Sequence, residues 1–192
     1  MPRVIHPIEV ESYRILRSRI DLTHLPPLSR AVAERVIHAS ADLSFGESLV
    51  LDEAALRRGR EALFAGAPVY CDARMAAAGI TSRTPIVPLD DPRAKAATGM
   101  TRSAAALRLA TTEAPPGAVW VIGNAPTALT ELIGRPPPDP ALVVGLPVGF
   151  VGAAEAKEAL AASGLPCVTN RGERGGSAVA VAAVNALLYF EP

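Results

Sequence analysis

Short apolar runs alternate with longer Ala-rich segments from about residue 68 to the end of the chain. The runs are rich in β-branched residues and too short and uniformly apolar to show the alternation of a half-exposed strand, as is typical of strands buried on both faces. They predict five strands, at 68–71, 85–89, 118–122, 141–146 and 166–169. Strands that alternate with helices in this way form a mostly parallel sheet with helices on both faces.

Helix start and stop signals support this organisation. Asp52 precedes one helical segment and Gly66 follows it, while Asn124 precedes Pro126 and Gly134 closes the next. Two further helices are predicted ahead of the sheet, at 8–20 and 29–39, as an N-terminal helical segment. The run RPPPDP at 135–140 is stiff but too short to divide the chain, so residues 1–192 are predicted to form a single domain.

Charge and composition exclude several classes of function. Nineteen basic residues balance nineteen acidic ones, which argues against general binding to nucleic acid or to an anionic membrane. No apolar run approaches the roughly 20 residues that span a bilayer, and the first residues lack the apolar stretch of a secretory signal, which predicts a cytoplasmic location. Cys71 and Cys167 are isolated and are interpreted as buried thiols.

A functional site is expected at the junctions where a strand ends and a helix begins, because ligands of parallel sheets bind beyond the carboxyl ends of the strands. Four such junctions are rich in Gly and small polar residues: 71–72, 123–127, 145–152 and 170–177. Each is alternatively an ordinary tight turn. The chain has no GxGxxG, no GxxxxGK[ST], no GxSxG and no closely spaced His pair. We therefore expect neither a metal site built by the protein nor hydrolase chemistry, and nucleotide binding becomes a minor possibility.

Two ionisable clusters stand out. His38 follows Arg35 by three residues and precedes Asp42 by four, so one helix face would carry all three side chains. The arginine would then favour the neutral form of the imidazole and the aspartate its charged form. Arg102 lies between two hydroxyl residues at the start of an Ala-rich helix, a pattern that suits a carboxylate or phosphate clamp. The alternatives are a histidine placed by the helix dipole and a solvated arginine beside a helix cap.

Five further basic residues of the predicted helices are expected to lie on solvated faces. They are Arg17, Arg57, Arg58, Arg60 and Lys157.

Six ordered segments resemble the precorrin-8X methylmutase family and span nearly the whole chain. They are RVIHASAD (35–42), GAPVYCDARMAAAGIT (66–81), TRSAAAL (101–107), IGNAPTAL (122–129), GLPVGFVGAAEAKEAL (145–160) and RGERGGSAVAVAAVNAL (171–187). The resemblance implies a three-layer α/β/α, flavodoxin-like fold and a homodimer that binds a corrin precursor near the subunit interface. It also implies an isomerase of cobalamin biosynthesis that moves a methyl group between adjacent ring carbons, a reaction for which no cofactor is expected.

The same resemblance implies roles for individual residues. His38 matches the catalytic histidine of the family, and Arg102 matches an arginine that holds a peripheral carboxylate. Ser12, Arg35 and Thr81 match further substrate contacts. The substrate would be precorrin-8X or its cobalt-containing equivalent, and the sequence does not separate the two. The alternatives are a non-catalytic corrinoid carrier and a small-anion or nucleotide module of the same sheet class.

Overall fold

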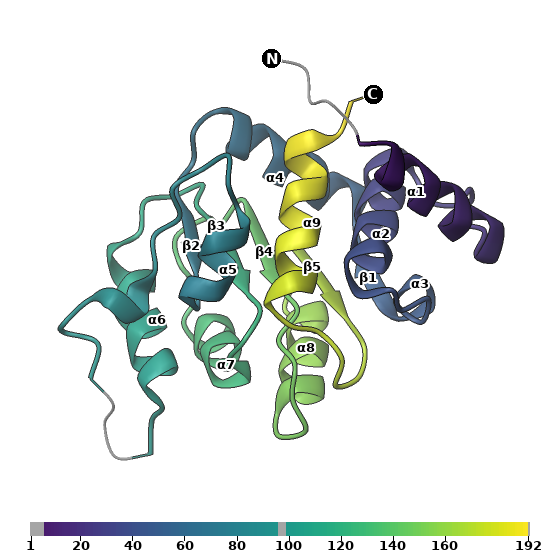
Figure 1. Ribbon diagram of the computed structural model, residues 1–192. Coiled ribbons are helices and arrows are strands. Elements are labelled where there is room, and N and C mark those ends of the chain that lie inside the picture. The colour runs from purple at the N-terminus through teal and green to yellow at the C-terminus, as the bar shows by residue number, and fades with distance from the viewer. Residues whose placement is uncertain (1–5, 96–98, 192) are drawn as a thin grey trace.

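The computed structural model describes residues 6–95 and 99–191, which form a five-stranded sheet with helices on both faces (Figure 1). The strands are β1 (Leu49–Leu51), β2 (Val69–Cys71), β3 (Val119–Ile122), β4 (Leu142–Gly145) and β5 (Cys167–Asn170). The helices are α1 (Pro7–Arg19), α2 (Pro27–Ser40), α3 (Phe45–Ser48), α4 (Glu53–Phe64), α5 (Arg74–Gly79), the 3₁₀ turn η1 (Pro88–Asp90), α6 (Arg102–Glu113), α7 (Pro126–Gly134), α8 (Ala153–Ala162) and α9 (Ser177–Tyr189).

The sheet has the strand order β1-β5-β4-β3-β2. Strands β2 to β5 are parallel neighbours in chain order, and β1 closes one edge antiparallel to β5, with Leu49 opposite Asn170. Right-handed crossovers that all step in one direction place their helices on the same face. Helices α6, α7 and α8 accordingly cover one face, which confirms the predicted three-layer, mostly parallel α/β/α fold.

Alternate residues of each strand feed two hydrophobic cores, one on either face of the sheet. Val119 and Val121 of β3 join the core beneath α2, α4, α5 and α9, whereas Trp120 and Ile122 join the core beneath α6, α7 and α8. All four are fully buried. This explains the absence of polar alternation in the strand sequences, because each side of the sheet faces a helical layer.

The structure corrects two details of the predicted sheet. The strand predicted at 85–89 is wrong: only Ile86 pairs with β2, through a single bridge to Tyr70, and η1 follows. Pro85 and Pro88 have no N–H to donate, so the ladder cannot extend beyond Ile86. Conversely, the edge strand β1 was not predicted.

The two predicted N-terminal helices are present as α1 and α2, and α2 packs along α9 (yellow in Figure 1). Val32 and Val36 of α2 are fully buried, so this helix is part of a core layer. Within the described residues, no helix combines the length and apolar character that crossing a membrane requires.

Candidate active site

His38 lies in the last turn of α2 and is held by two residues of α1. The Ser12 hydroxyl and His38 Nδ1 share a hydrogen bond of 2.8 Å. The Tyr13 ring stacks on the imidazole, with ring centroids 4.9 Å apart and planes inclined by 13°. Among the described residues, Nε2 of His38 has no hydrogen-bond partner. Helix α1 therefore fixes one nitrogen and one face of the imidazole and leaves the other nitrogen for a ligand.

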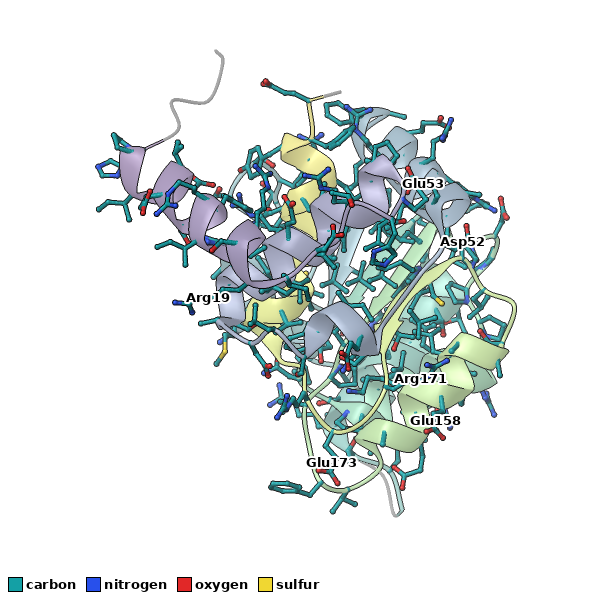
Figure 2. All side chains as sticks on the ribbon, turned by 90° about the vertical axis from the view of Figure 1, so that its right-hand side faces the viewer. Arg19, Asp52, Glu53, Glu158, Arg171 and Glu173 are labelled. Atoms are coloured by element: carbon teal, nitrogen blue, oxygen red, sulfur yellow. The ribbon has the colours of Figure 1, made fainter. Side chains whose placement is uncertain are left out.

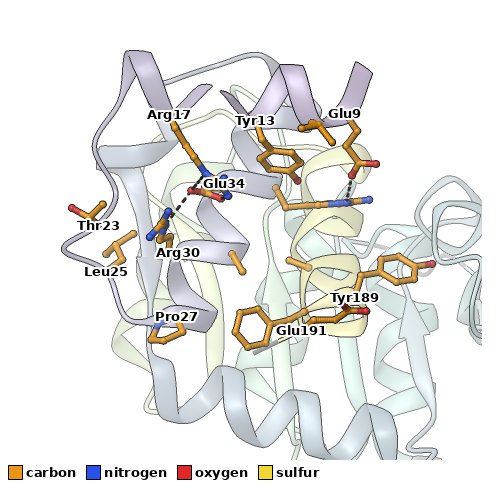
Figure 3. A pocket seen from close by; sticks show the side chains of 15 residues that line it. Glu9, Tyr13, Arg17, Thr23, Leu25, Pro27, Arg30, Glu34, Tyr189 and Glu191 are labelled. Carbon is orange, nitrogen blue, oxygen red and sulfur yellow. Dashed lines mark hydrogen bonds and ion pairs between the residues drawn. The ribbon is translucent and has the colours of Figure 1, made fainter. Parts of the chain in front are cut away.

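A buried acidic residue fixes the packing of α1 on α2. Glu34 accepts two hydrogen bonds from Arg17, at 2.9 and 2.7 Å, and one from Arg30 at 3.1 Å (Figure 3). Burial raises the pKa of Glu34, but the two guanidinium groups outweigh it and hold the pKa below its usual value. Because this charge network joins the two helices, it sets the register that brings Ser12 to His38.

A second carboxylate anchors the start of α2 from α4. Glu53 accepts hydrogen bonds from the backbone N–H groups of Leu28 and Ser29, at 3.0 and 2.8 Å, and from the Ser29 hydroxyl at 2.7 Å. These N–H groups lie in the first turn of the helix, where they lack helical partners. Glu53 thus acts as a cap supplied by another helix.

Arg35 lies one turn before His38 on α2, but its side chain faces a cavity that His38 does not line. It lines a cavity of about 710 Å³ between α1, α2 and the end of α9, together with Tyr13 and Tyr189 (Figure 3). Its Nη1 donates to Glu9 Oε1 at 3.1 Å, and its guanidinium lies 5.8 Å from the centroid of the Tyr189 ring. Tyr13 contacts both His38 and this cavity.

The expectation that Arg35, His38 and Asp42 share one helix face is wrong for Asp42. Helix α2 ends at Ser40, and Ala41 adopts a left-handed conformation with φ 53° that turns the chain away. Asp42 instead forms an ion pair of 3.0 Å with Arg174 of the β5–α9 loop. The carboxylate therefore ties that loop to the end of α2.

Arg102 begins α6, on the opposite face of the sheet from α2. Thr101 caps the helix by accepting a hydrogen bond from Ala104 N at 3.2 Å, and its hydroxyl lies 2.7 Å from that of Thr127. The exposed Arg102 donates to the Leu89 carbonyl at 2.9 Å. The start of α6 is thereby joined to the start of α7, at the carboxyl edge of the parallel strands.

The predicted site residues thus fall into separate groups within one chain. The structure brings Ser12 to His38, and Arg35 lies on the same helix as His38. Arg102 lies in the other helical layer, beyond the sheet. Thr81 is exposed beyond the end of α5 and makes no hydrogen bond to either group among the described residues.

A buried aspartate organises the junction after β3. Asp72 follows β2 and accepts hydrogen bonds from the backbone N–H groups of Gly123, Asn124 and Ala125, at 3.1, 2.7 and 2.8 Å. Burial raises the pKa of Asp72, and the three donors act against that shift. This aspartate holds the loop that begins α7.

Lys157 is completely buried, so its predicted place on a solvated face is wrong. Its ammonium donates to Asn170 Oδ1 at 3.1 Å and to the Arg174 carbonyl at 2.5 Å. The Asn170 amide donates to the same carbonyl at 3.0 Å. Burial lowers the pKa of Lys157 to about 8, opposed by the charge of Glu173. These two side chains hold the turn of the β5–α9 loop.

Comparison with known proteins identifies the family. The precorrin-8X methylmutase family model matches residues 7–190. A precorrin-8X methylmutase of Pseudomonas aeruginosa is 46% identical, covering 92% of this chain and 91% of that protein. A cobalt-precorrin-8 methylmutase of Salmonella typhimurium is 41% identical, with coverage of 95% and 93%. The crystal structure of the Thermus thermophilus precorrin-8x methyl mutase has a TM-score of 0.85 at 36% identity, covering 95% of this chain and 96% of that one. The chain therefore belongs to the precorrin-8X methylmutase family.

Proposed function

We propose that this protein is an isomerase of cobalamin biosynthesis that shifts a methyl group between adjacent carbons of a corrin precursor. It would convert precorrin-8X to hydrogenobyrinic acid, or cobalt-precorrin-8 to cobyrinic acid. Family membership supports the reaction class, and relatives of both names are similar to the chain at over 40% identity. The observation that carries the mechanism is the Ser12–His38 hydrogen bond, which leaves Nε2 of the histidine unpaired among the described residues.

The proposed role of His38 is that of a general acid. Protonation of a ring nitrogen makes the neighbouring carbon electron-poor and lowers the barrier to methyl migration. General acids of this kind typically contribute on the order of 10² to 10⁴ in rate. When His38 is protonated, both ring nitrogens carry a hydrogen, so Nδ1 donates to the Ser12 hydroxyl and the proton on Nε2 is the one to be transferred. Ser12, implied by the resemblance to be a substrate contact, thus also orients the acid.

The anionic rim of the substrate requires local positive charge, because the protein as a whole has none in excess. We assign this role to Arg35 and Arg102, with Thr81 as a further contact. Charge-assisted hydrogen bonds from arginine suit carboxylates, because the guanidinium presents paired donors. Arg35 would exchange its bond to Glu9 for one to a substrate carboxylate.

A homodimer accounts for the separation of the proposed site residues. In one chain the sheet lies between the layer that holds His38 and the layer that holds Arg102. A substrate bound at a subunit interface would meet His38 of one protomer and Arg102 of its partner. Light scattering combined with size exclusion tests the predicted dimer. The cytoplasmic location and the absence of a cofactor remain predictions.

The experiment follows the visible spectrum of excess substrate with wild type, His38→Ala and the control His24→Ala, whose histidine is exposed. Cobalt-free and cobalt-containing substrates are assayed separately. We expect multiple turnovers by wild type and by the control, and none by His38→Ala, which should still bind product. Near-normal turnover by His38→Ala would refute the acid role. Binding of both substrates by wild type without conversion would favour the carrier function instead.

A further inference from the structure

The loop between β4 and α8 carries two large apolar side chains that are almost fully exposed. Phe150 is 90% exposed and Val151 is 88% exposed, more than any other large apolar residue of the described chain. We call this pair the apolar tip. Two adjacent side chains of this kind contribute nothing to the cores of the chain, and exposed apolar clusters commonly mark binding sites.

The apolar tip is held in a defined shape. Gly149 donates its N–H to the Glu173 carbonyl at 3.1 Å. Gly149 and Gly152, on either side of the tip, both lie near Pro126 at the start of α7, since a β-carbon added at these positions would be 3.8 and 4.0 Å from the proline ring. Gly152 adopts a positive φ of 75°, which a residue with a side chain rarely does. Neighbouring loops therefore support the tip from two directions.

Contacts along the carboxyl edge of the sheet connect the tip to both groups of proposed site residues. On one side, Pro126 is followed by Thr127, whose hydroxyl meets that of Thr101 next to Arg102. On the other side, Glu173 is followed by Arg174, which reaches the segment just after α2. Figure 2 shows Glu173 at the lower end of the molecule, and Figure 1 shows the β4–α8 and β5–α9 loops together at this edge.

Three exposed arginines flank the tip along this edge, together with one exposed acidic residue, Glu173. Arg102 is exposed on one side, and Arg171 and Arg174 are exposed on the other. Arg174 is paired with Asp42, and Arg102 bonds only to a backbone carbonyl among the described residues. An apolar centre between cationic flanks complements a flat ligand with apolar faces and a rim of carboxylates.

We propose that Phe150 and Val151 bind one apolar face of the corrin macrocycle, while the flanking arginines meet its carboxylates. This inference rests on the proposed function, and it assigns substrate binding to residues outside the Ser12–His38 pair. Burying a side chain as large as Phe against a ligand typically contributes about 1.5–3 kcal/mol, equivalent to a change in affinity of about tenfold or more.

The test compares wild type with the double variant Phe150→Ser/Val151→Ser. Each protein is titrated with hydrogenobyrinic acid and the binding is followed by visible absorbance. We expect the dissociation constant of the variant to rise by about tenfold or more with Tm unchanged, because both side chains are exposed in the free protein. Phe150→Leu should retain most of the affinity. Met75→Ser is the matched control, since Met75 is 69% exposed on α5.

The outcomes are distinguishable. Equal affinity of wild type and double variant would overturn the inference, as would loss of affinity that accompanies a change from dimer to monomer, because the tip would then bind a second copy of the chain. In either of these two outcomes, conversion of substrate by wild type would leave the proposed function standing. If wild type neither binds nor converts any corrinoid, the proposed function fails and this inference fails with it.

Discussion

Replacement of the buried ammonium in Lys157→Met should change how stability depends on pH. Lys157 is 0% exposed, and its hydrogen bonds go to an amide oxygen and a backbone carbonyl, without a carboxylate. Burial lowers its pKa from 10.5 to about 8. Methionine keeps an unbranched side chain of similar length but cannot be protonated. The variant therefore removes the ionisation and preserves most of the packing.

The sign and size of the effect follow from proton linkage. Between pH 8 and 10.5 the unfolded chain retains a proton that the folded protein has released, so raising the pH favours the folded state. With a folded pKa of about 8, integration from pH 7 to pH 9 gives about 1.4 kcal/mol. Burial raises the pKa values of Cys71 and Cys167 to about 12 and 11. Above the pKa that these thiols have in the unfolded chain, they make stability fall as the pH rises. The effect is the same in wild type and in Lys157→Met, so it cancels in the difference between their free energies of unfolding.

The measurement is urea unfolding at pH 7 and pH 9, followed by the fluorescence of the single, buried Trp120. The free energy of unfolding of wild type minus that of Lys157→Met should increase by about 1.4 kcal/mol between the two pH values. Lys95→Met is the control, because Lys95 is exposed and its removal should leave no pH-dependent difference. A difference for Lys157→Met that is independent of pH would refute the argument, since it would mean that the ammonium retains an ordinary pKa.

The other predictions concern packing, a buried carboxylate and the proposed clamp. Gly59→Ala should lower the free energy of unfolding by about 1–3 kcal/mol, because the new β-carbon would lie 2.8 Å from Cβ of Leu142. Gly134→Ala is the control and should not destabilise the protein, because the space around Gly134 is open. Equal urea midpoints for the two variants would contradict this prediction. Asp72→Ala leaves three backbone N–H groups without their acceptor and should cost about 1–3 kcal/mol or more in the same assay, and an unchanged midpoint would count against it. Arg102→Ala should weaken binding of hydrogenobyrinic acid by about 1.5–3 kcal/mol in an absorbance titration, and unchanged affinity would remove it from the site.

The parallel strands were predictable because each is a buried apolar run bounded by turn residues. The edge strand β1 is only three residues long and partly buried, and it becomes a strand through its pairing with β5. That pairing joins segments more than a hundred residues apart, so no local pattern announces it. The segment 85–89 shows the opposite case: its composition is strand-like, but its prolines remove the donors that a ladder needs.

The burial of Lys157 was visible in the periodicity of its own helix. Ala153, Ala156 and Leu160 of α8 are buried, and Lys157 completes the i, i+3, i+4, i+7 stripe that they define. A basic residue type in an Ala-rich helix suggested solvent exposure, yet the position lay on the core face. Periodicity does not identify the hydrogen-bond acceptors that allow the ammonium group to be buried, because Asn170 and the Arg174 carbonyl lie outside α8.

Local spacing made His38 a candidate but misplaced Asp42 beside it. Asp42 was expected one turn further along the helix, where it would have favoured the charged imidazole. The helix ends first, at the left-handed Ala41, and the contacts of the imidazole come from Ser12 and Tyr13, some 26 residues earlier in the chain. The hydroxyl and the stacked ring fix the orientation of the imidazole. The chemistry proposed for His38 therefore depends on the packing of α1 against α2, and through it on the buried charge network that fixes that packing.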